Sequence, residues 1–186
     1  MSQRPFRFVT QVAVTSTAPP ETVFATVVDL RAHLEWSGER AEDETFKLLA
    51  IEQTSPGEVA VGTTFESSGA NFNGTFHDRS VVAELSAPNV VVIETDARLD
   101  RDHGKPWEVH FTHRYDIAPD GAGSRITYTE TISRLNYVPY WLKAPVRPIT
   151  RRAINSGDTK QLRNLAALAE ERAPGDGRSL DTAGSD

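Results

Sequence analysis

A carboxylate, an imidazole and two phenols recur at alternating positions in two consecutive extended segments of the chain. His113 and Tyr115 lie in one segment, and Tyr128 and Glu130 lie in the next. Because side chains two residues apart in a strand point to the same face, all four are predicted to face the interior together. Burial would raise the pKa of the carboxyl and lower that of the imidazole, while an ion pair would oppose both changes.

Two interpretations of this cluster stay open at this stage. In the catalytic one, Glu130, His113 and Tyr128 form an acid/base site that moves protons on an enolisable substrate. In the structural one, the same groups form a satisfied polar network, or mark strand ends at the mouth of a cavity, since buried polar groups are usually paired.

A fourth candidate, Arg79, lies in a segment whose alternation is ambiguous. Neither face of the segment 75–85 is uniformly apolar, which suggests a β-bulge that switches the register. If Arg79 points inward, its guanidinium could hold a ligand carbonyl, carboxylate or phenolate. The alternative is an exposed surface arginine, as most arginines are.

Metal and cofactor chemistry find little support in the sequence. The chain has no cysteine, and it lacks a phosphate-binding glycine loop, an HExxH pair and a Gly-x-Ser-x-Gly elbow. His110 and His113 are three apart in a predicted strand, so they point to opposite faces and do not chelate one ion there. We therefore expect no metal and no cofactor.

Large aromatic side chains are spread over the predicted strands and loops. They could line a ligand pocket or fill the core, because sequence gives side-chain type and not cavity volume. The set is Trp36, Phe65, Phe72, Phe76, Trp107, Phe111, Tyr115 and Trp141.

The segment 131–157 is basic and contains no acidic residue, although the whole chain has a net charge of −6. Its cations alternate with aromatic residues, a pattern that suits an anionic ligand or a lipid headgroup surface. The predicted membrane-surface contacts are Lys143, Arg147, Arg151 and Arg152. The alternative is a solvated helix start beside an aromatic loop.

Periodicity and turn residues predict the elements that position these groups. Strands are expected at Phe6–Thr15, Phe46–Thr54, Gly62–Gly69, Thr75–Leu85, Val90–Arg98, Trp107–Ile117 and Arg125–Arg134. A helix begins at the Pro19-Pro20 pair and is followed by a short turn towards Trp36. One long helix runs from Ile149 to about Arg172.

Length and composition point to one globular domain, 1–172, followed by a disordered tail, 173–186. No apolar run approaches a membrane span, and the first residues do not resemble a signal peptide, so a cytoplasmic protein is expected. The negative net charge disfavours nucleic-acid binding.

The order of elements, together with several short motifs, resembles the START / Bet v 1-like (SRPBCC) superfamily, and within it the polyketide cyclase/dehydrase and lipid-transport group. The similar residues are Ala18–Phe24, Asp29-Leu30, Glu35-Trp36, Val61–Phe65 and Val82–Pro88. The resemblance implies an α+β helix-grip fold, in which a curved seven-stranded antiparallel sheet wraps around a long C-terminal helix, with two short helices after the first strand.

The resemblance also implies a function. It suggests a small hydrophobic ligand, polyketide-like or lipid, held in an internal cavity by a cofactor-independent cyclase/dehydratase. Cavity arginines and tyrosines orient the substrate in such relatives, which suggests this role for Arg79 and Tyr128. The alternative is a non-catalytic carrier or sensor of a lipid or small molecule, and a third, less supported hypothesis is a protein-interaction role.

Overall fold

The structure is a computed structural model that describes residues 6–41, 46–71 and 74–174. Strand β1 (Phe8–Ser16) is followed by helix α1 (Pro20–Val28), helix α2 (Leu30–Leu34) and η1, a turn of π-helix (Glu35–Glu39). Six strands come next, and the chain closes with a short 3-10 turn, η2, and a long helix, α3. Their bounds are β2 (Phe46–Gln53), β3 (Thr64–Asn71), β4 (Gly74–Ser86), β5 (Val90–Arg101), β6 (Trp107–Asp120), β7 (Gly123–Ser133), η2 (Tyr140–Leu142) and α3 (Arg147–Arg172).

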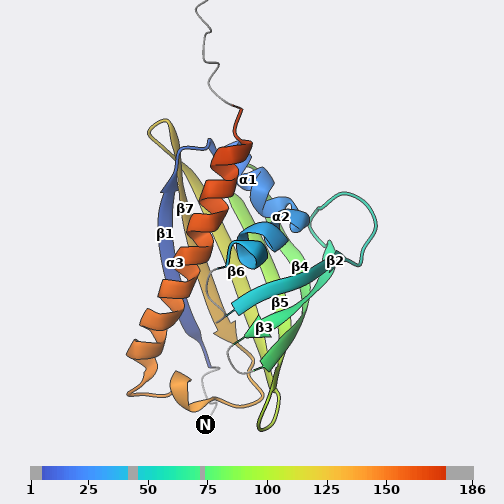
Figure 1. Ribbon diagram of the computed structural model, residues 1–186, viewed down its shortest axis with the longest axis vertical. Helices are drawn as coiled ribbons and strands as arrows, with labels where there is room; N and C mark the ends of the chain where they lie inside the picture. Colours follow the sequence, from blue (N-terminus) through green and yellow to red (C-terminus); the bar gives the residue numbers. More distant parts are fainter. Residues whose placement is uncertain (1–5, 42–45, 72–73, 175–186) are drawn as a thin grey trace, which may run out of the picture.

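All seven strands form one antiparallel sheet in the order β1-β7-β6-β5-β4-β3-β2. The sheet curves, and α3 runs along the length of its inner face, close to β1 (Figure 1). The helices α1 and α2 cover the same face near the C-terminal end of α3, while η2 lies beside the N-terminal end of α3 (Figure 1). This arrangement confirms the helix-grip α+β fold.

Local chemistry explains where the first helices begin and end. Pro20 occupies the first turn of α1, where its missing N–H costs no hydrogen bond. Asp29 ends α1, and its carboxylate then accepts a hydrogen bond from the Arg31 backbone N–H at 3.0 Å, which caps α2.

A β-bulge lies within the segment 75–85, in which the sequence suggested one. The pairing of β4 with β5 shifts between Val82 and Glu84, so the inward positions change parity at this point. Before the bulge, Phe76 and Val82 face inward. After it, Leu85 packs against the buried core.

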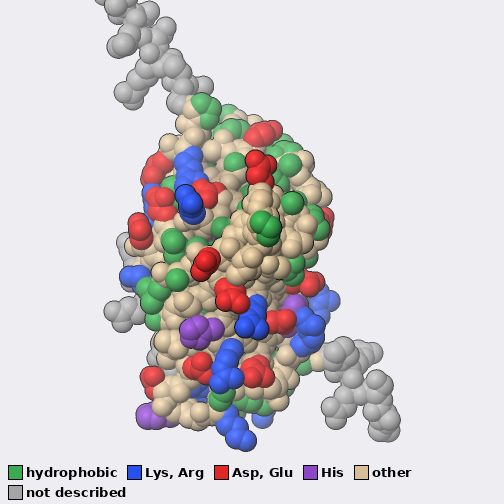
Figure 2. All heavy atoms as spheres, turned by 90° about the vertical axis from the view of Figure 1, so that its right-hand side faces the viewer, with side chains coloured by type: hydrophobic (Ala, Val, Ile, Leu, Met, Phe, Trp, Pro, Cys, Tyr) green, Lys and Arg blue, Asp and Glu red, His purple; other side chains and the backbone are tan. Residues whose placement is uncertain are grey.

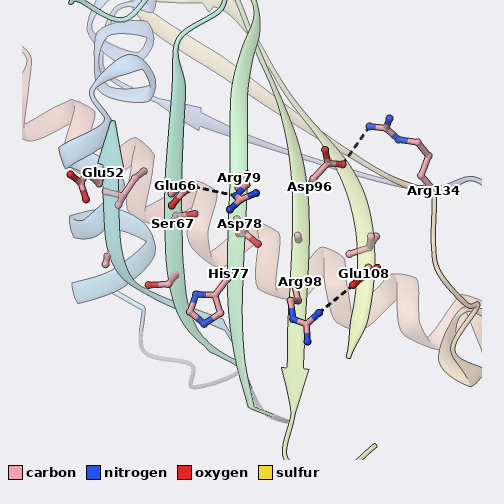
Figure 3. Close-up of a pocket in the computed structure, with 15 residues that line it drawn as sticks. Glu52, Glu66, Ser67, His77, Asp78, Arg79, Asp96, Arg98, Glu108 and Arg134 are labelled. Carbon is pink, nitrogen blue, oxygen red and sulfur yellow. Dashed lines mark hydrogen bonds and ion pairs between the residues drawn. The ribbon is translucent and has the colours of Figure 1, made fainter. Parts of the chain in front are cut away.

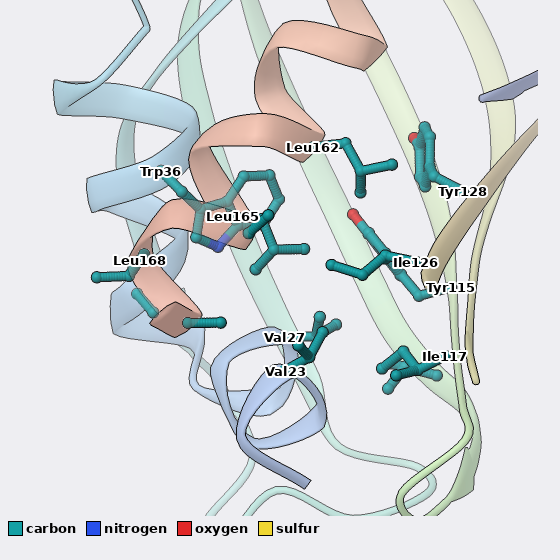
Figure 4. Packing of buried hydrophobic residues seen from close by; sticks show 14 of the residues in the cluster. Val23, Val27, Trp36, Tyr115, Ile117, Ile126, Tyr128, Leu162, Leu165 and Leu168 are labelled. Carbon is teal, nitrogen blue, oxygen red and sulfur yellow. The ribbon is translucent and has the colours of Figure 1, made fainter. Parts of the chain in front are cut away.

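The buried apolar side chains form two clusters on the inner side of the sheet. The cluster at the top of the view in Figure 1, here called the upper cluster, lies between α1, α3 and the sheet. It includes Val23, Val27, Tyr115, Ile126 and Leu165 (Figure 4). The lower cluster lies near η2 and includes Phe8, Trp107, Val109, Ile132 and Leu142. Together they hold α3 against the sheet.

Two of the sequence-based predictions, the disordered tail and the aromatic contact at Phe72, concern residues that the structure does not describe. Positions 175–186 of the expected tail and Phe72 lie outside the described residues. No helix among the described residues is long and apolar enough to cross a membrane.

Candidate functional site

Polar side chains occupy the inner positions between the two apolar clusters on six of the seven strands and on α3. On β6, for example, His113 lies between Phe111, which packs on the lower cluster, and Tyr115 of the upper cluster. On α3, Asp158 lies between Ile154 and Leu162 in the same way. We call this set the polar belt, and its members are Thr10, Ser67, Asp78, Ser80, Thr95, His113, Glu130 and Asp158.

The sheet register makes the belt continuous on the β1 side. Thr10 lies opposite Glu130, and Glu130 lies opposite His113. The Thr10 hydroxyl donates a long hydrogen bond of 3.4 Å to Asp158 Oδ2 across the interior. Glu130 and Asp158 thus meet from the sheet and from α3, as the sequence did not predict.

His113, Tyr128 and Glu130 form a hydrogen-bonded chain. His113 Nδ1 and the Tyr128 hydroxyl are 2.7 Å apart, and Tyr128 is also hydrogen-bonded to the Glu130 carboxylate. With the His113 proton on Nδ1, the ring donates to Tyr128 and the hydroxyl donates to Glu130. The ring of Tyr128 lies 4.9 Å from that of Tyr115, centroid to centroid.

Burial sets the protonation of these groups. Removal from water, and the charge of Asp158, raise the pKa of Glu130 well above its usual range, against a smaller opposing effect of the Tyr128 hydrogen bond. Burial likewise raises the pKa of Asp158, opposed by the Thr10 hydrogen bond. The carboxyl pair therefore holds a proton near neutral pH, as paired carboxyls do when no cation lies between them.

The imidazole responds in the opposite sense. Burial, followed by the neighbouring charges of His33 and His110, lowers the pKa of His113 to about 4, so its ring is neutral. Burial raises the pKa of Tyr128, and nearby carboxylates add to the change. A protonated carboxyl beside a neutral imidazole and a phenol can donate, accept and relay a proton.

A second part of the belt lies on β3, β4 and β5. Ser67 is opposite Asp78 in the sheet and gives its carboxylate a hydrogen bond. Burial raises the pKa of Asp78 to about 7, and the Ser67 hydrogen bond partly opposes this. The Ser80 and Thr95 hydroxyls, both buried, bond each other at 2.9 Å.

Arg79 does not belong to the site. Its side chain is 84% exposed on the outer face and pairs with Glu66 at 3.1 Å (Figure 3). The inward orientation considered for Arg79 is therefore wrong, because the bulge lies beyond it in the chain and leaves Phe76, Asp78 and Ser80 on the inner face.

The outer face carries a broad open groove of about 920 Å³. Six of the charged side chains that line it form pairs: Glu66 with Arg79, Arg98 with Glu108 at 3.2 Å, and Asp96 with Arg134 at 3.5 Å (Figure 3). Glu52 and Asp78 also line the groove and are not part of these pairs. Seen from the β2 side, acidic and basic side chains are interspersed over the lower half of the molecule (Figure 2). The groove is thus a solvated face on which most of the charges are compensated.

His110 and His113 point to opposite faces, as predicted. His110 Nδ1 lies 2.8 Å from Asp96 Oδ1 on the outer side and also contacts the Arg134 guanidinium. His113 faces Tyr128 on the inner side.

The predicted aromatic ligand contacts divide into two groups. Five are buried in close packing: Trp36, Phe65, Phe76, Trp107 and Tyr115. Phe111 and Trp141 are half-buried, and the Phe111 ring stacks on that of His113 with centroids 5.6 Å apart.

Asp158 and Asp78 are the site residues that the sequence analysis missed. Asp158 interrupts the apolar stripe of the last helix, between Ile154 and Leu162, and a carboxylate in that stripe is the signal that could have revealed it. Asp78 could be placed only after the bulge had been located.

Comparison with known proteins supplies the family. Residues 7–170 match the model of the family described as polyketide cyclase / dehydrase and lipid transport. The chain belongs to this family. No curated protein matches the sequence.

Solved structures support the fold. A putative uncharacterized protein from Rhizobium leguminosarum is similar with a TM-score of 0.63 and 15% identity, over 91% of this chain and 97% of the other. Ara h 8.0201 is similar with a TM-score of 0.61 and 13% identity, over 89% and 99%. DynU16, a putative protein in the dynemicin biosynthetic locus, has a TM-score of 0.52 and 16% identity, over 89% of this chain and 48% of the other. At these identities the likeness concerns the fold.

Proposed function

We propose that this member of the polyketide cyclase / dehydrase and lipid-transport family binds a small hydrophobic ligand between the sheet and α3. One observation carries the proposal: a belt of polar side chains crosses the interior between two apolar clusters. His113, Glu130 and Asp158 face inward yet stay partly accessible to solvent. Polar groups so placed are expected to meet water or a ligand.

The arrangement favours a ligand with an apolar body and a polar group. The apolar body would contact the half-buried rings of Phe111 and Trp141, and the polar group would reach Glu130 and Asp158. Because none of the influences on the pKa of either carboxyl is a cation, the site favours neutral or cationic groups over a carboxylate.

Catalysis at this site is the more specific form of the proposal. In the carboxylate form, Glu130 would take a proton from the carbon beside a ligand carbonyl. Once Glu130 is protonated, the Tyr128 hydroxyl no longer donates to a carboxylate and would instead donate its hydrogen bond to the enolate oxygen that forms. For ring closure, the enolate carbon would attack a second carbonyl of the ligand and the proton on Glu130 would pass to the new alkoxide. For loss of water, the enolate would expel a β-hydroxyl group, and the proton on Glu130 would convert this leaving group into water. No cofactor enters this scheme, and the family description supports it.

Mass spectrometry of the purified protein tests the binding proposal. Native spectra, followed by denaturing extraction, should reveal a co-purified molecule on the wild type. Glu130→Gln should carry less of it, while Glu94→Gln, on the outer face of β5, should carry as much as the wild type. A protein without any bound molecule, which also fails to bind the neutral dye N-phenyl-1-naphthylamine saturably, would contradict the proposal.

A carrier that contacts membranes is the second candidate, favoured by the surface near η2. Tyr140 is 69% exposed and Ile149 is 73% exposed, and Lys143, Arg151 and Arg152 are exposed around them. Arg147, also predicted to contact membranes, instead lies over the rings of Phe6 and Phe8 and donates a hydrogen bond to the Arg7 carbonyl oxygen at 2.6 Å.

Sedimentation with vesicles tests this second candidate. Vesicles that contain phosphatidylglycerol should bind the wild type in a salt-sensitive manner, and Ile149→Ser with Lys143→Ser should weaken the binding. Equal recovery with purely zwitterionic vesicles would remove the electrostatic contact.

A further inference from the structure

Asp78 has an unexplained buried oxygen atom. Its side chain faces the interior, because its neighbours Phe76 and Ser80 on the same face are buried while His77 and Arg79 on the other face are exposed. Ser67 satisfies part of the carboxylate, yet Oδ1 is buried without a hydrogen-bond partner. Buried polar atoms in folded proteins are rarely left unpaired, so this one calls for a partner.

The neighbouring hydroxyls leave a donor available. Ser80 is two residues from Asp78 on the same face, and it lies opposite Thr95. The two hydroxyls have two protons between them, and their mutual hydrogen bond uses one. Asp78, Ser80 and Thr95 together can therefore both accept a hydrogen bond and donate one.

Apolar surroundings isolate this group of side chains. Along β4, Phe76 lies on one side and Val82 on the other, and Ala97 of β5 is directly opposite Asp78. The charged groups of the outer groove pair with each other, and none of them is hydrogen-bonded to Asp78, although Ser67 and Asp78 also line that groove. Because the Asp78 side chain faces the interior, its partner is expected from the inner side.

We propose that Asp78, with Ser67, Ser80 and Thr95, forms a second polar subsite that binds a hydroxyl or carbonyl group of the ligand. This proposal rests on the proposed function, since it assigns a second contact to the same interior ligand. One polar group of the ligand lies at Glu130 and Asp158, and a second polar group lies at Asp78. The ligand is therefore an elongated molecule with a polar group near each end.

Strand spacing sets the scale of this ligand. Three strand-to-strand steps separate β4 from β7, which is roughly 14 Å at about 4.8 Å per step. The curvature of the sheet and the length of the side chains shorten the gap that the ligand spans. The half-buried ring of Phe111, which is opposite Thr95, provides an apolar contact between the two polar ends.

A matched series of rigid probes tests the subsite: biphenyl, 4-phenylphenol and 4,4′-biphenol. Binding is measured by calorimetry or tryptophan fluorescence on the wild type, Asp78→Ala, Asp78→Asn and the outer-face control His77→Ala. On the wild type, the second hydroxyl should improve the dissociation constant about tenfold, the effect of one good hydrogen bond. Asp78→Ala should lose that gain and keep the affinity for 4-phenylphenol, while Asp78→Asn and His77→Ala should retain the gain.

The possible results separate the two proposals. If 4-phenylphenol and 4,4′-biphenol bind the wild type equally, or if Asp78→Ala weakens all probes alike, the subsite is refuted and the interior ligand site stands. If no probe binds the folded wild type, both proposals fail. Circular dichroism of each variant verifies that the fold is intact.

Discussion

Replacing Asp78 by asparagine should make the protein more stable at neutral and alkaline pH. The carboxyl has a pKa of about 7 in the folded protein, chiefly because it is buried, against 3.8 for an ordinary aspartate. A carboxyl with a raised pKa binds more protons in the folded state than in the unfolded state. The free energy of unfolding of the wild type therefore falls as the pH rises from about 4 to about 7.

The size of this effect follows from the pKa change. At about 1.4 kcal/mol per pKa unit, the ionised side chain costs at most about 4 kcal/mol above pH 7. Relaxation and water entry around a half-buried group reduce this, so we expect Asp78→Asn to gain about 2 to 4 kcal/mol at pH 8. The amide keeps the shape of the carboxyl and can still bond Ser67.

Urea denaturation between pH 5 and pH 8.5 measures the effect. The difference between Asp78→Asn and the wild type should grow with pH and level off above about pH 8. Glu94→Gln, a similar change on the exposed face of β5, should show no such trend. A variant that is less stable than the wild type at pH 8, or a difference that does not change with pH, would refute the assignment of Asp78 as a buried and uncompensated acid.

Three further changes test the rest of the structure. Glu130→Gln should raise the free energy of unfolding at pH 8, and this free energy should then fall less steeply between pH 5 and pH 8 than in the wild type. The reason is that burial and a second carboxyl raise the pKa of Glu130. An unchanged pH dependence of urea denaturation would contradict this. Tyr128→Phe should lower stability by about 1 to 3 kcal/mol, since His113 loses its hydroxyl partner, and a melting temperature equal to that of the wild type would count against the hydrogen bond. Gly69→Ala should lower stability by about 2 kcal/mol or more, because a methyl group there would clash with the Lys47 carbonyl oxygen and with the Phe76 ring; a fully stable variant would show that the packing around β3 is looser than described.

Alternation along β6 and β7 was sufficient to predict half of the site. Strands with one buried face impose a strict period of two, so His113, Tyr128 and Glu130 could be assigned to the interior from spacing alone. The same logic predicted opposite directions for His110 and His113.

The other half depends on tertiary structure. Asp158 approaches Glu130 only because α3 crosses β1 and β7 at that level, a contact between residues distant in the chain. The inward faces of β4 depend on a bulge whose position the sequence does not mark, so Arg79 was considered as an inward group and Asp78 was not. Whether aromatic rings line or fill space depends on volumes that follow from packing.

The polar belt also divides the apolar core into two separate bodies. Because the two clusters share few apolar contacts across the belt, one cluster can lose its packing while the other keeps its own. Proteins with such a division can unfold partially, in separate cooperative units. Amide hydrogens near η2 and the start of α3 should then exchange by a lower-energy opening than those of the upper cluster. A molecule bound across the belt would couple the two clusters into one cooperative unit. It would therefore slow amide exchange near η2 and the start of α3, including at residues that it does not contact.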